Sequence, residues 1–352
     1  MIELRKMQSW DRYLPELFFS HLGLHIEDYD VDAIETGKMN YVFRVQTDKG
    51  IFFLKQALSK AKADKTLGST LRTISSRRLE YEKTCISELS ALLPDGTEIP
   101  SVHYYDPASH ILLLSDVAGD GGRLLESVLF EGIFDVWTAS AVGRFLGAMH
   151  RRTWGAQRCI RGDRRNDRKN WVRFLEMRTK GIFDDRISSQ ILVALENLYQ
   201  QTLRRHSYDV LIWMDCCPKN VIVRKDRKIG VIDFELASWI GDPAYDLGFF
   251  IGHYFIHAIQ NNVPATSLQA IAGSIRAYFS EIEGMAFRAG MVTRMLKFAA
   301  ATIFYRIAGA SRLNYIETES IPHLIHKAGA ILCNDFKGEP DNAISLITEV
   351  LA

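Results

Sequence analysis

The spacing of the apolar residues changes once along the chain, near Ser115, and this change limits the folds that the chain can adopt. Before Ser115, short apolar runs separated by turn residues are typical of an antiparallel sheet. They predict five β-strands, at residues 29–34, 41–45, 51–55, 102–105 and 111–114. One helix is expected among these strands, because apolar residues recur at spacings of three and four from Leu79 to Leu93. One member of that apolar stripe is an acid, Glu82.

Beyond Ser115 the spacing is mostly that of helices. Helices are expected at residues 134–152, 171–180, 188–205, 245–260, 267–283, 290–310 and 323–333, and short strands at 210–212, 221–223 and 229–232. The charged segment 161–169 is interpreted as a solvated loop. The sequence therefore predicts an α+β protein with a small antiparallel-sheet N-lobe (1–115) and a larger, mostly helical C-lobe (116–352).

Composition excludes several classes of protein. With 352 residues, 47% of them hydrophobic, the chain is long enough for two domains or one bilobal enzyme. Its formal net charge of +1 provides no basic field for nucleic acid or an anionic membrane. The first residues contain no apolar core of signal-peptide length, and no apolar run is long enough to span a membrane. Five cysteines without C-x-x-C spacing favour reduced thiols. We expect a cytoplasmic protein, monomeric or homodimeric, without nucleic-acid or membrane partners.

A group of polar residues in the C-lobe suggests phosphoryl transfer. Asp215 and Asn220 are five residues apart between two expected strands, and Asp233 and Glu235 directly follow a third. This reaction needs a carboxylate that accepts a hydroxyl proton, together with oxygen ligands for Mg²⁺. Each residue also has a simpler interpretation: Asp215 and Asn220 could be turn residues, and Asp233 could cap a helix.

The expected N-lobe has matching features. Lys55 ends a strand and Glu82 lies on the following helix, a combination that can hold the phosphates of ATP. The turn at residues 35–40, with Gly37 and Asn40, is placed to fold over those phosphates. Lys55 could instead be an ordinary strand-end lysine, and Glu80 could replace Glu82 as its partner. The joint order of all these residues favours a kinase.

These residues resemble a known family. The chain is similar, over nearly its whole length, to the aminoglycoside phosphotransferase and choline kinase superfamily, whose fold is similar to that of protein kinases. The most specific stretch is 210–248, with Asp215-x4-Asn220, Val231-Ile232-Asp233-Phe234-Glu235 and Gly241-Asp242-Pro243-Ala244-Tyr245-Asp246-Leu247-Gly248. Parts of the chain, namely residues 40–45, 54–58 and 306–309, resemble the 5-methylthioribose kinases.

The resemblance implies a role for each matching residue. Asp215 would be the catalytic base, and Asn220, Asp233 and Glu235 would bind Mg²⁺. Lys55 would contact the ATP phosphates with Glu82 orienting it, while Ser115, Asp116 and Val117 would form the hinge that meets adenine. Asp246 would be a structural acid that supports the catalytic loop. Arg306 would contact the acceptor, although it could instead pair with a local acid.

The resemblance predicts an ATP- and Mg²⁺-dependent kinase of a small-molecule hydroxyl acceptor, such as a sugar or a thio-sugar like 5-methylthioribose. Aminoglycoside, choline and homoserine-type acceptors are the alternatives. One departure favours a different class, a pseudokinase that binds without turnover. The family usually has His-Gly before the catalytic Asp, where this chain has Trp213 and Met214. Methionine lacks the conformational freedom of glycine, and Trp cannot reproduce the hydrogen bonds of an imidazole.

Overall fold

The computed structural model describes residues 2–7, 9–35, 39–59, 75–182, 184–204, 208–334, 336 and 338–351. The chain forms two compact units. Met1–Ala91, Ile99–Gly119 and Asp233–Glu235 make up the first unit, and Leu92–Glu98, Asp120–Ile232 and Leu236–Ala352 make up the second. The division into lobes at residue 115 stays a prediction.

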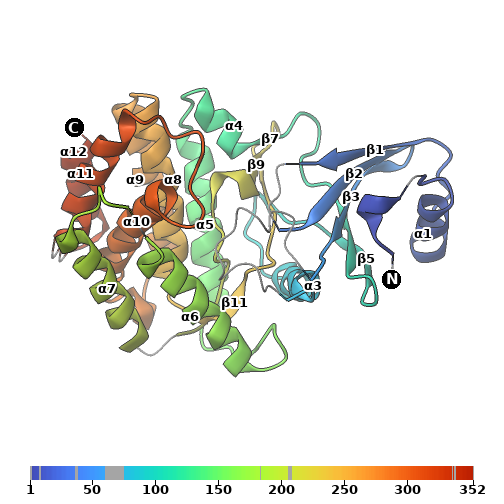
Figure 1. Cartoon of the computed structure of the whole chain (residues 1–352), viewed down its shortest axis with the longest axis horizontal. Coiled ribbons are helices and arrows are strands. Elements are labelled where there is room, and N and C mark those ends of the chain that lie inside the picture. Colours follow the sequence, from blue (N-terminus) through green and yellow to red (C-terminus); the bar gives the residue numbers. More distant parts are fainter. Residues whose placement is uncertain are drawn as a thin grey trace. The chain divides into compact units, whose positions relative to one another are not determined.

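The first unit contains an antiparallel sheet of five strands in the order β1-β2-β3-β6-β5. The strands are β1 (Tyr29–Ile34), β2 (Tyr41–Thr47), β3 (Gly50–Gln56), β5 (Val102–Asp106) and β6 (Ile111–Ser115). Helix α3 (Arg78–Leu89) belongs to this unit (Figure 1). The five-strand prediction is confirmed. Within α3 the expected stripe is buried, including Glu82, which has no exposed surface.

Two elements that were not predicted complete the first unit, the 3₁₀ turn η1 (Leu4–Lys6) and helix α1 (Tyr13–Leu22). Leu14, Leu17 and Phe18 of α1 are buried in one cluster with strand residues such as Leu54. The Phe18 and Phe52 rings meet edge to face, with centroids 4.8 Å apart. The sheet therefore has an apolar core on the side that α1 covers.

The second unit is mostly helical, as predicted (Figure 1). Its helices are α4 (Leu125–Phe130), α5 (Val136–Thr153), α6 (Arg164–Lys180), α7 (Ser189–Arg204), α8 (Ala244–Gln260), α9 (Pro264–Glu281), α10 (Met291–Ala308), α11 (Ser320–Cys333) and α12 (Pro340–Leu351). Its strands are β4 (Thr97–Glu98), β7 (Arg123–Leu124), β8 (Tyr208–Ile212), β9 (Val221–Val223), β10 (Ile229–Val231) and β11 (Ser238–Gly241), with 3₁₀ turns η2 (Pro218–Asn220) and η3 (Ala286–Arg288).

Glycines set the close packing of the long helices in the second unit. Helices α5 and α9, and helices α8 and α10, pack pairwise (Figure 1). A Cβ on Gly252 of α8 would lie 2.7 Å from the Ala299 carbonyl oxygen of α10, and one on Gly147 of α5 would lie 2.8 Å from the Tyr278 carbonyl oxygen of α9. The backbones can approach this closely only because no side chain intervenes. This packing fixes α8 and α10, the helices of Asp246 and Arg306.

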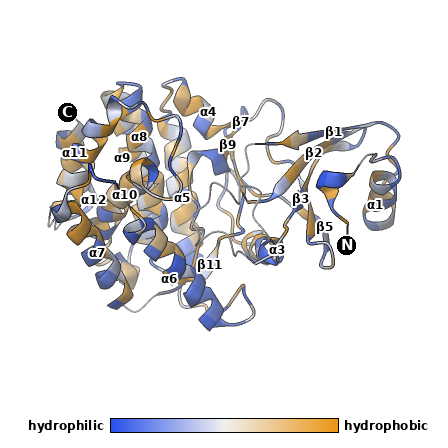
Figure 2. Cartoon of the chain, viewed as in Figure 1, coloured by the Kyte–Doolittle hydropathy of each residue, from blue (hydrophilic) through white to orange (hydrophobic). Residues whose placement is uncertain are grey.

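The expected loop at residues 161–169 was wrong, because α6 begins at Arg164. The Asp163 carboxylate accepts a hydrogen bond from the Asn166 N–H (2.9 Å) and caps the helix. The first turns are charged, hydrophilic in Figure 2, and long charged side chains are good helix formers. Elsewhere the second-unit helices agree with the prediction within a few residues, apart from α4 and α12, which it omitted. In the described part of the chain, no helix is both long and apolar enough to cross a membrane.

Candidate active site

In the first unit, a buried lysine contacts two acids. The Lys55 Nζ donates to both carboxylate oxygens of Glu82, at 2.7 and 2.9 Å, and to Oδ1 of Asp233, at 2.9 Å. Glu80, the alternative partner, instead forms an ion pair with Arg77. The structure thus brings Lys55, Glu82 and Asp233 together, although Asp233 lies 178 residues beyond Lys55.

The electrostatics of this cluster keep the lysine protonated. Burial by itself would lower the pKa of Lys55, but the carboxylates of Asp233, Glu82 and Glu235 raise it above its usual value. Burial raises the pKa of Glu82, against the opposing effect of Lys55. The result is a fixed ammonium group whose acid partners prevent it from moving away.

Asn40 and Glu235 belong to a second network in the first unit. The Asn40 side-chain amide donates to Oε2 of Glu235 at 2.6 Å, and its oxygen accepts from Nε of Arg78, also at 2.6 Å. Arg78 also lies 3.5 Å from Oε2 of Glu235 and donates to the Met39 carbonyl at 2.9 Å. Asn40 and Glu235 are therefore tied to Arg78, a residue that the sequence reasoning did not select. Gly37 lies outside the described residues.

The expected hinge residues follow strand β6. The Ser115 N–H donates to the Ser101 carbonyl at 3.0 Å, and the Asp116 N–H donates to the Ile51 carbonyl at 3.3 Å. The Asp116 carboxylate accepts from the Ala118 N–H at 3.0 Å, and Val117 is buried. The segment is an ordered continuation of the sheet, and its contact with adenine stays a prediction.

In the second unit, Asp246 fixes the segment before Asp215. Its two carboxylate oxygens accept from the backbone N–H groups of Trp213 (2.7 Å) and Met214 (2.8 Å). The Nε2 of His150 lies 3.2 Å from Oδ2 of Asp246, and its Nδ1 lies 2.7 Å from the Tyr278 hydroxyl. Asp246 has no exposed surface. These bonds are what the predicted structural acid requires.

Asp215 lies among three cations. Asn220 donates to the Asp215 Oδ2 at 3.0 Å, while Arg178 Nη2 and Lys219 Nζ lie 3.2 and 3.4 Å from its carboxylate oxygens. Burial by itself raises the pKa of Asp215, but Lys219, Arg178 and Arg306 together bring it down to about 2. Asp215 is therefore an ionised acceptor at neutral pH. Arg178, in the last turn of α6, was not among the predicted site residues.

Arg306 is buried and makes hydrogen bonds to neutral groups. Its Nε donates to Nε2 of His253 at 3.1 Å, and its Nη1 donates to the Ser311 carbonyl and hydroxyl at 3.2 and 3.1 Å. The guanidinium also lies 5.3 Å from the centre of the Phe249 ring. Among the described residues, no carboxylate lies within ion-pair distance of Arg306, and its contact with the acceptor stays a prediction.

Two buried histidines on α8 surround this region. Burial, followed by the nearby Arg306, lowers the pKa of His253, and burial lowers the pKa of His257 to about 4. The His257 ring stacks against Tyr315, whose hydroxyl lies 3.5 Å from Oε1 of Glu126. Both histidines are neutral at pH 7. The second unit thus contains neutral histidines in the same region as Arg306, whose charge affects the pKa of both Asp215 and His253.

The residues predicted to bind Mg²⁺ differ in their availability. The Asn220 side-chain nitrogen donates two hydrogen bonds to Asp215, one to its backbone oxygen and one to its carboxylate, and neither bond uses the Asn220 side-chain oxygen. The Glu235 carboxylate, in contrast, is bound by Asn40 and Arg78. Asp233 offers carboxylate oxygens of the kind that Mg²⁺ prefers. No group of three or more His, Cys, Asp or Glu in the described ranges could by itself bind a metal.

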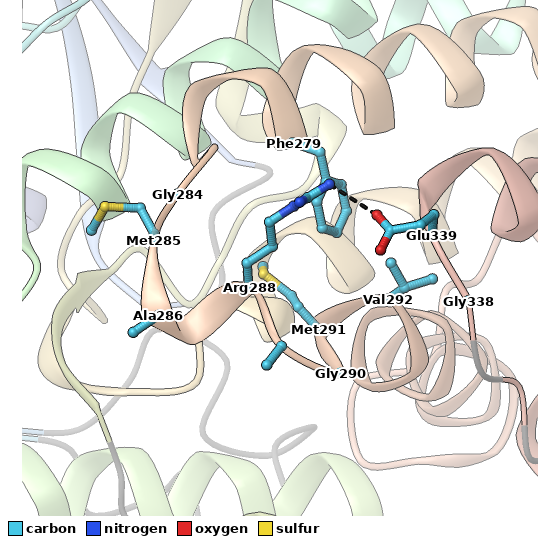
Figure 3. A pocket seen from close by; sticks show the side chains of 11 residues that line it. Phe279, Gly284, Met285, Ala286, Arg288, Gly290, Met291, Val292, Gly338 and Glu339 are labelled. Carbon is cyan, nitrogen blue, oxygen red and sulfur yellow. Dashed lines mark hydrogen bonds and ion pairs between the residues drawn. The ribbon is translucent and has the colours of Figure 1, made fainter.

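A separate cavity of about 330 Å³ lies in the second unit, between the end of α9 and the start of α10 (Figure 3). Arg288 pairs there with Glu339 at 2.9 Å, which Figure 3 shows as a dashed line. None of the predicted site residues lines this cavity. It therefore belongs to no part of the candidate active site.

The chain resembles known phosphotransferases and kinases in sequence pattern and in fold. The model of the phosphotransferase enzyme family matches residues 30–287, and no curated protein matches the chain. Macrolide 2'-phosphotransferase MphH of Brachybacterium faecium has 18% identity and a TM-score of 0.50, covering 92% of this chain and 99% of its own. The GDP complex of wild-type aminoglycoside 2'-phosphotransferase-IIIa has 14% identity and a TM-score of 0.50, covering 94% and 100%. Plasmodium vivax ethanolamine kinase has 12% identity and a TM-score of 0.50, covering 96% and 87%.

These matches confirm the predicted protein-kinase-like fold, with an antiparallel sheet near the N-terminus and helices in the remainder. The family match covers 258 consecutive residues, from 30 to 287, and includes Lys55, Asp215 and Asp233. The chain belongs to the phosphotransferase enzyme family.

Proposed function

We propose that this protein transfers the terminal phosphoryl group of ATP, with Mg²⁺, to a hydroxyl group of a small metabolite. The observation on which the proposal rests is the buried contact of Lys55 with Glu82 and Asp233. A lysine fixed by a helix acid is suited to neutralise the phosphates of a nucleotide. One of the similar proteins contains GDP in its structure, which supports a nucleotide as the donor.

In this proposal the first unit binds the nucleotide. Lys55 contacts the phosphates and Glu82 orients it, and we assign Gly37 and Asn40 to the same nucleotide. Ser115, Asp116 and Val117 meet the adenine with backbone groups. Asp233 and Asn220 supply oxygen ligands to Mg²⁺, which when bound neutralises developing charge on the phosphates. Glu235 contributes less directly, because Asn40 and Arg78 already bind its carboxylate.

Asp215 is the proposed catalytic base. Its carboxylate is ionised at neutral pH and can accept a hydrogen bond from the acceptor hydroxyl. A carboxylate with a pKa of about 2 is a weak base, so its main contribution is to orient the hydroxyl toward the phosphorus. Phosphoryl transfer with a loose transition state requires mostly such positioning, together with compensation of charge.

The charges around Asp215 indicate the acceptor class. Arg178, Lys219 and Arg306 all lower the pKa of Asp215, so the region repels polycations such as aminoglycosides. The neutral His253 and His257 can bind hydroxyl groups. We therefore propose a neutral or weakly charged hydroxylated acceptor, a sugar or a thio-sugar such as 5-methylthioribose, with Arg306 in contact with it.

A second candidate is a pseudokinase that binds ATP without transferring phosphate, and the observation that favours it is the presence of Trp213 and Met214 where the family usually has His-Gly.

We also propose a cytoplasmic protein, monomeric or homodimeric, with an N-lobe at 1–115 and a C-lobe at 116–352.

The test is a panel of acceptors with ATP and Mg²⁺: 5-methylthioribose, other pentoses, choline, homoserine and kanamycin. A sugar should give the highest kcat/KM, and Arg306→Ala should raise its KM. Preference for kanamycin or choline would overturn the sugar assignment, and an unchanged KM would remove Arg306 from the acceptor site. A melting temperature that rises with ATP and Mg²⁺, without turnover of any acceptor, would favour the pseudokinase.

A further inference from the structure

Met214 adopts a backbone conformation that normally requires glycine. Its φ is +69°, in the left-handed region, and its side chain is fully buried. For a residue with a Cβ this conformation is disfavoured by roughly 5–30-fold. The residue directly precedes Asp215, so its conformation determines the direction in which the Asp215 side chain leaves the loop.

Both ends of Met214 are bound by buried charged groups. Asp246 accepts from its N–H at 2.8 Å, and Nη1 of Arg178 donates to its carbonyl oxygen. The same guanidinium extends to the residue that follows, because Nη2 of Arg178 donates to Oδ1 of Asp215 at 3.2 Å. One side chain thus contacts both the strained residue and the proposed base.

Aromatic rings hold Arg178 in place. Its guanidinium carbon lies 4.4 Å from the centre of the Phe249 ring and 5.4 Å from that of Tyr245, whose hydroxyl also accepts from Nη1. The side chain is 6% exposed, and its one carboxylate partner among the described residues is Asp215. A planar guanidinium fixed by rings in this way loses little freedom when it makes its hydrogen bonds.

We propose that Arg178 is a positioning residue that replaces the missing glycine: it holds Met214 in the left-handed conformation and thereby aims Asp215 at the acceptor. This inference rests on the proposed function for its kinetic effect, and it gives a reason why a chain without the usual His-Gly can remain active. It assigns Arg178 no contact with the nucleotide or the acceptor.

Arg178 could affect the reaction through its charge or by restraining the backbone, and variants of residue 214 distinguish these two effects. If it acts only through its charge on Asp215, its removal has the same effect whichever residue precedes Asp215. If it restrains the backbone, its removal matters less when residue 214 needs no restraint. Met214→Gly and Met214→Ala form a matched pair, since both lose the packing of the Met side chain but only glycine tolerates the left-handed conformation without strain.

The kinetic test measures the effect of Arg178→Met in the parent, Met214→Ala and Met214→Gly backgrounds, with the best acceptor of the panel. In the first two backgrounds we expect kcat to fall by roughly 10–100-fold, the effect of losing hydrogen bonds to a charged group. With Met214→Gly the fall should be smaller by roughly 5–30-fold. The KM for ATP should change by less than about threefold in every variant. Equal losses of kcat in the three backgrounds would overturn the proposal.

A structural readout tests the same idea without any acceptor. In a crystal structure of the Arg178→Met variant, φ of Met214 should leave the left-handed region, and in the Arg178→Met, Met214→Gly double variant it should stay there. A single variant that keeps φ near +69° would overturn the inference. If Arg178→Met does not fold, Arg178→Lys, which keeps the charge but not the planar donors, takes its place. If the parent phosphorylates no acceptor, the proposed function is wrong. The two crystal structures would still show whether Arg178 holds Met214 in the left-handed conformation.

Discussion

Replacing Asp246 with Asn should destabilise the second unit strongly. The fully buried carboxylate accepts from the Trp213 and Met214 N–H groups at 2.7 and 2.8 Å. In Asp246→Asn one oxygen becomes an NH₂ group that faces an N–H donor. A lost hydrogen bond to a charged group costs about 1.5–3 kcal/mol, and a buried donor without a partner costs about 1–3 kcal/mol more. We therefore expect the free energy of unfolding to fall by roughly 3–5 kcal/mol.

Urea unfolding followed by tryptophan fluorescence and far-UV circular dichroism measures this loss. It should be conspicuous, because whole domains are stable by only about 5–15 kcal/mol. Asp226→Asn is the matched control: Asp226 is exposed and pairs with Arg224 at 2.8 Å, so its loss should cost less than about 1 kcal/mol. If Asp246→Asn unfolds within about 1 kcal/mol of that control, Asp246 does not support the loop in the way described.

Three further predictions concern the metal, the pH dependence and the helix packing. Asp233→Ala should abolish the Mg²⁺ dependence of ATP affinity, because a carboxylate ligand is lost. Calorimetry of ATP binding with and without Mg²⁺ measures this dependence, and an unchanged dependence would mean that Asp233 does not bind the metal. The pKa of His257 is lowered to about 4 in the folded chain, so stability should fall as the pH drops below about 6.5, by about 2 kcal/mol between pH 7 and 5. Urea unfolding should show a smaller fall in His257→Gln, and an equal one would assign the effect to other groups. Gly252→Ala should lower the free energy of unfolding by about 1–3 kcal/mol, because its Cβ would lie 2.7 Å from the Ala299 carbonyl oxygen. Gly329→Ala is the control and should be near neutral in urea unfolding, because its Cβ would meet only the end of a flexible Ile191 side chain.

The sequence was most informative where a pattern is local. The strands of the first unit follow from short apolar runs between turns, and Glu82 was selected because it is an acid within an apolar helical stripe. The contact of Glu82 with Lys55 then needs only that the helix pack against the sheet. Strands β4, β7 and β11 have two to four residues each, and none is an uninterrupted run of β-branched residues like the equally short β9.

The residues that sequence reasoning missed are those whose burial depends on distant parts of the chain. Arg178 resembles an ordinary basic residue at the end of a helix, and the rings that bury it include those of Tyr245 and Phe249, about 70 residues further on. Arg78 closes a polar, basic segment, and its partner Asn40 lies 38 residues away. One signal was available for Arg178: a methionine in a position that usually needs glycine implies that other groups restrain the backbone there.

We propose a small-molecule kinase in which Asp215 acts on the acceptor hydroxyl. The most direct measurement follows ATP consumption and phosphorylated acceptor by ³¹P nuclear magnetic resonance, for the parent and for Asp215→Asn, with the best acceptor of the panel. The variant should bind ATP as the parent does, while its kcat falls by roughly 10²–10⁴-fold, because an amide neither orients the acceptor hydroxyl as the carboxylate does nor accepts its proton. A variant whose turnover stays within a few fold of the parent would contradict the account.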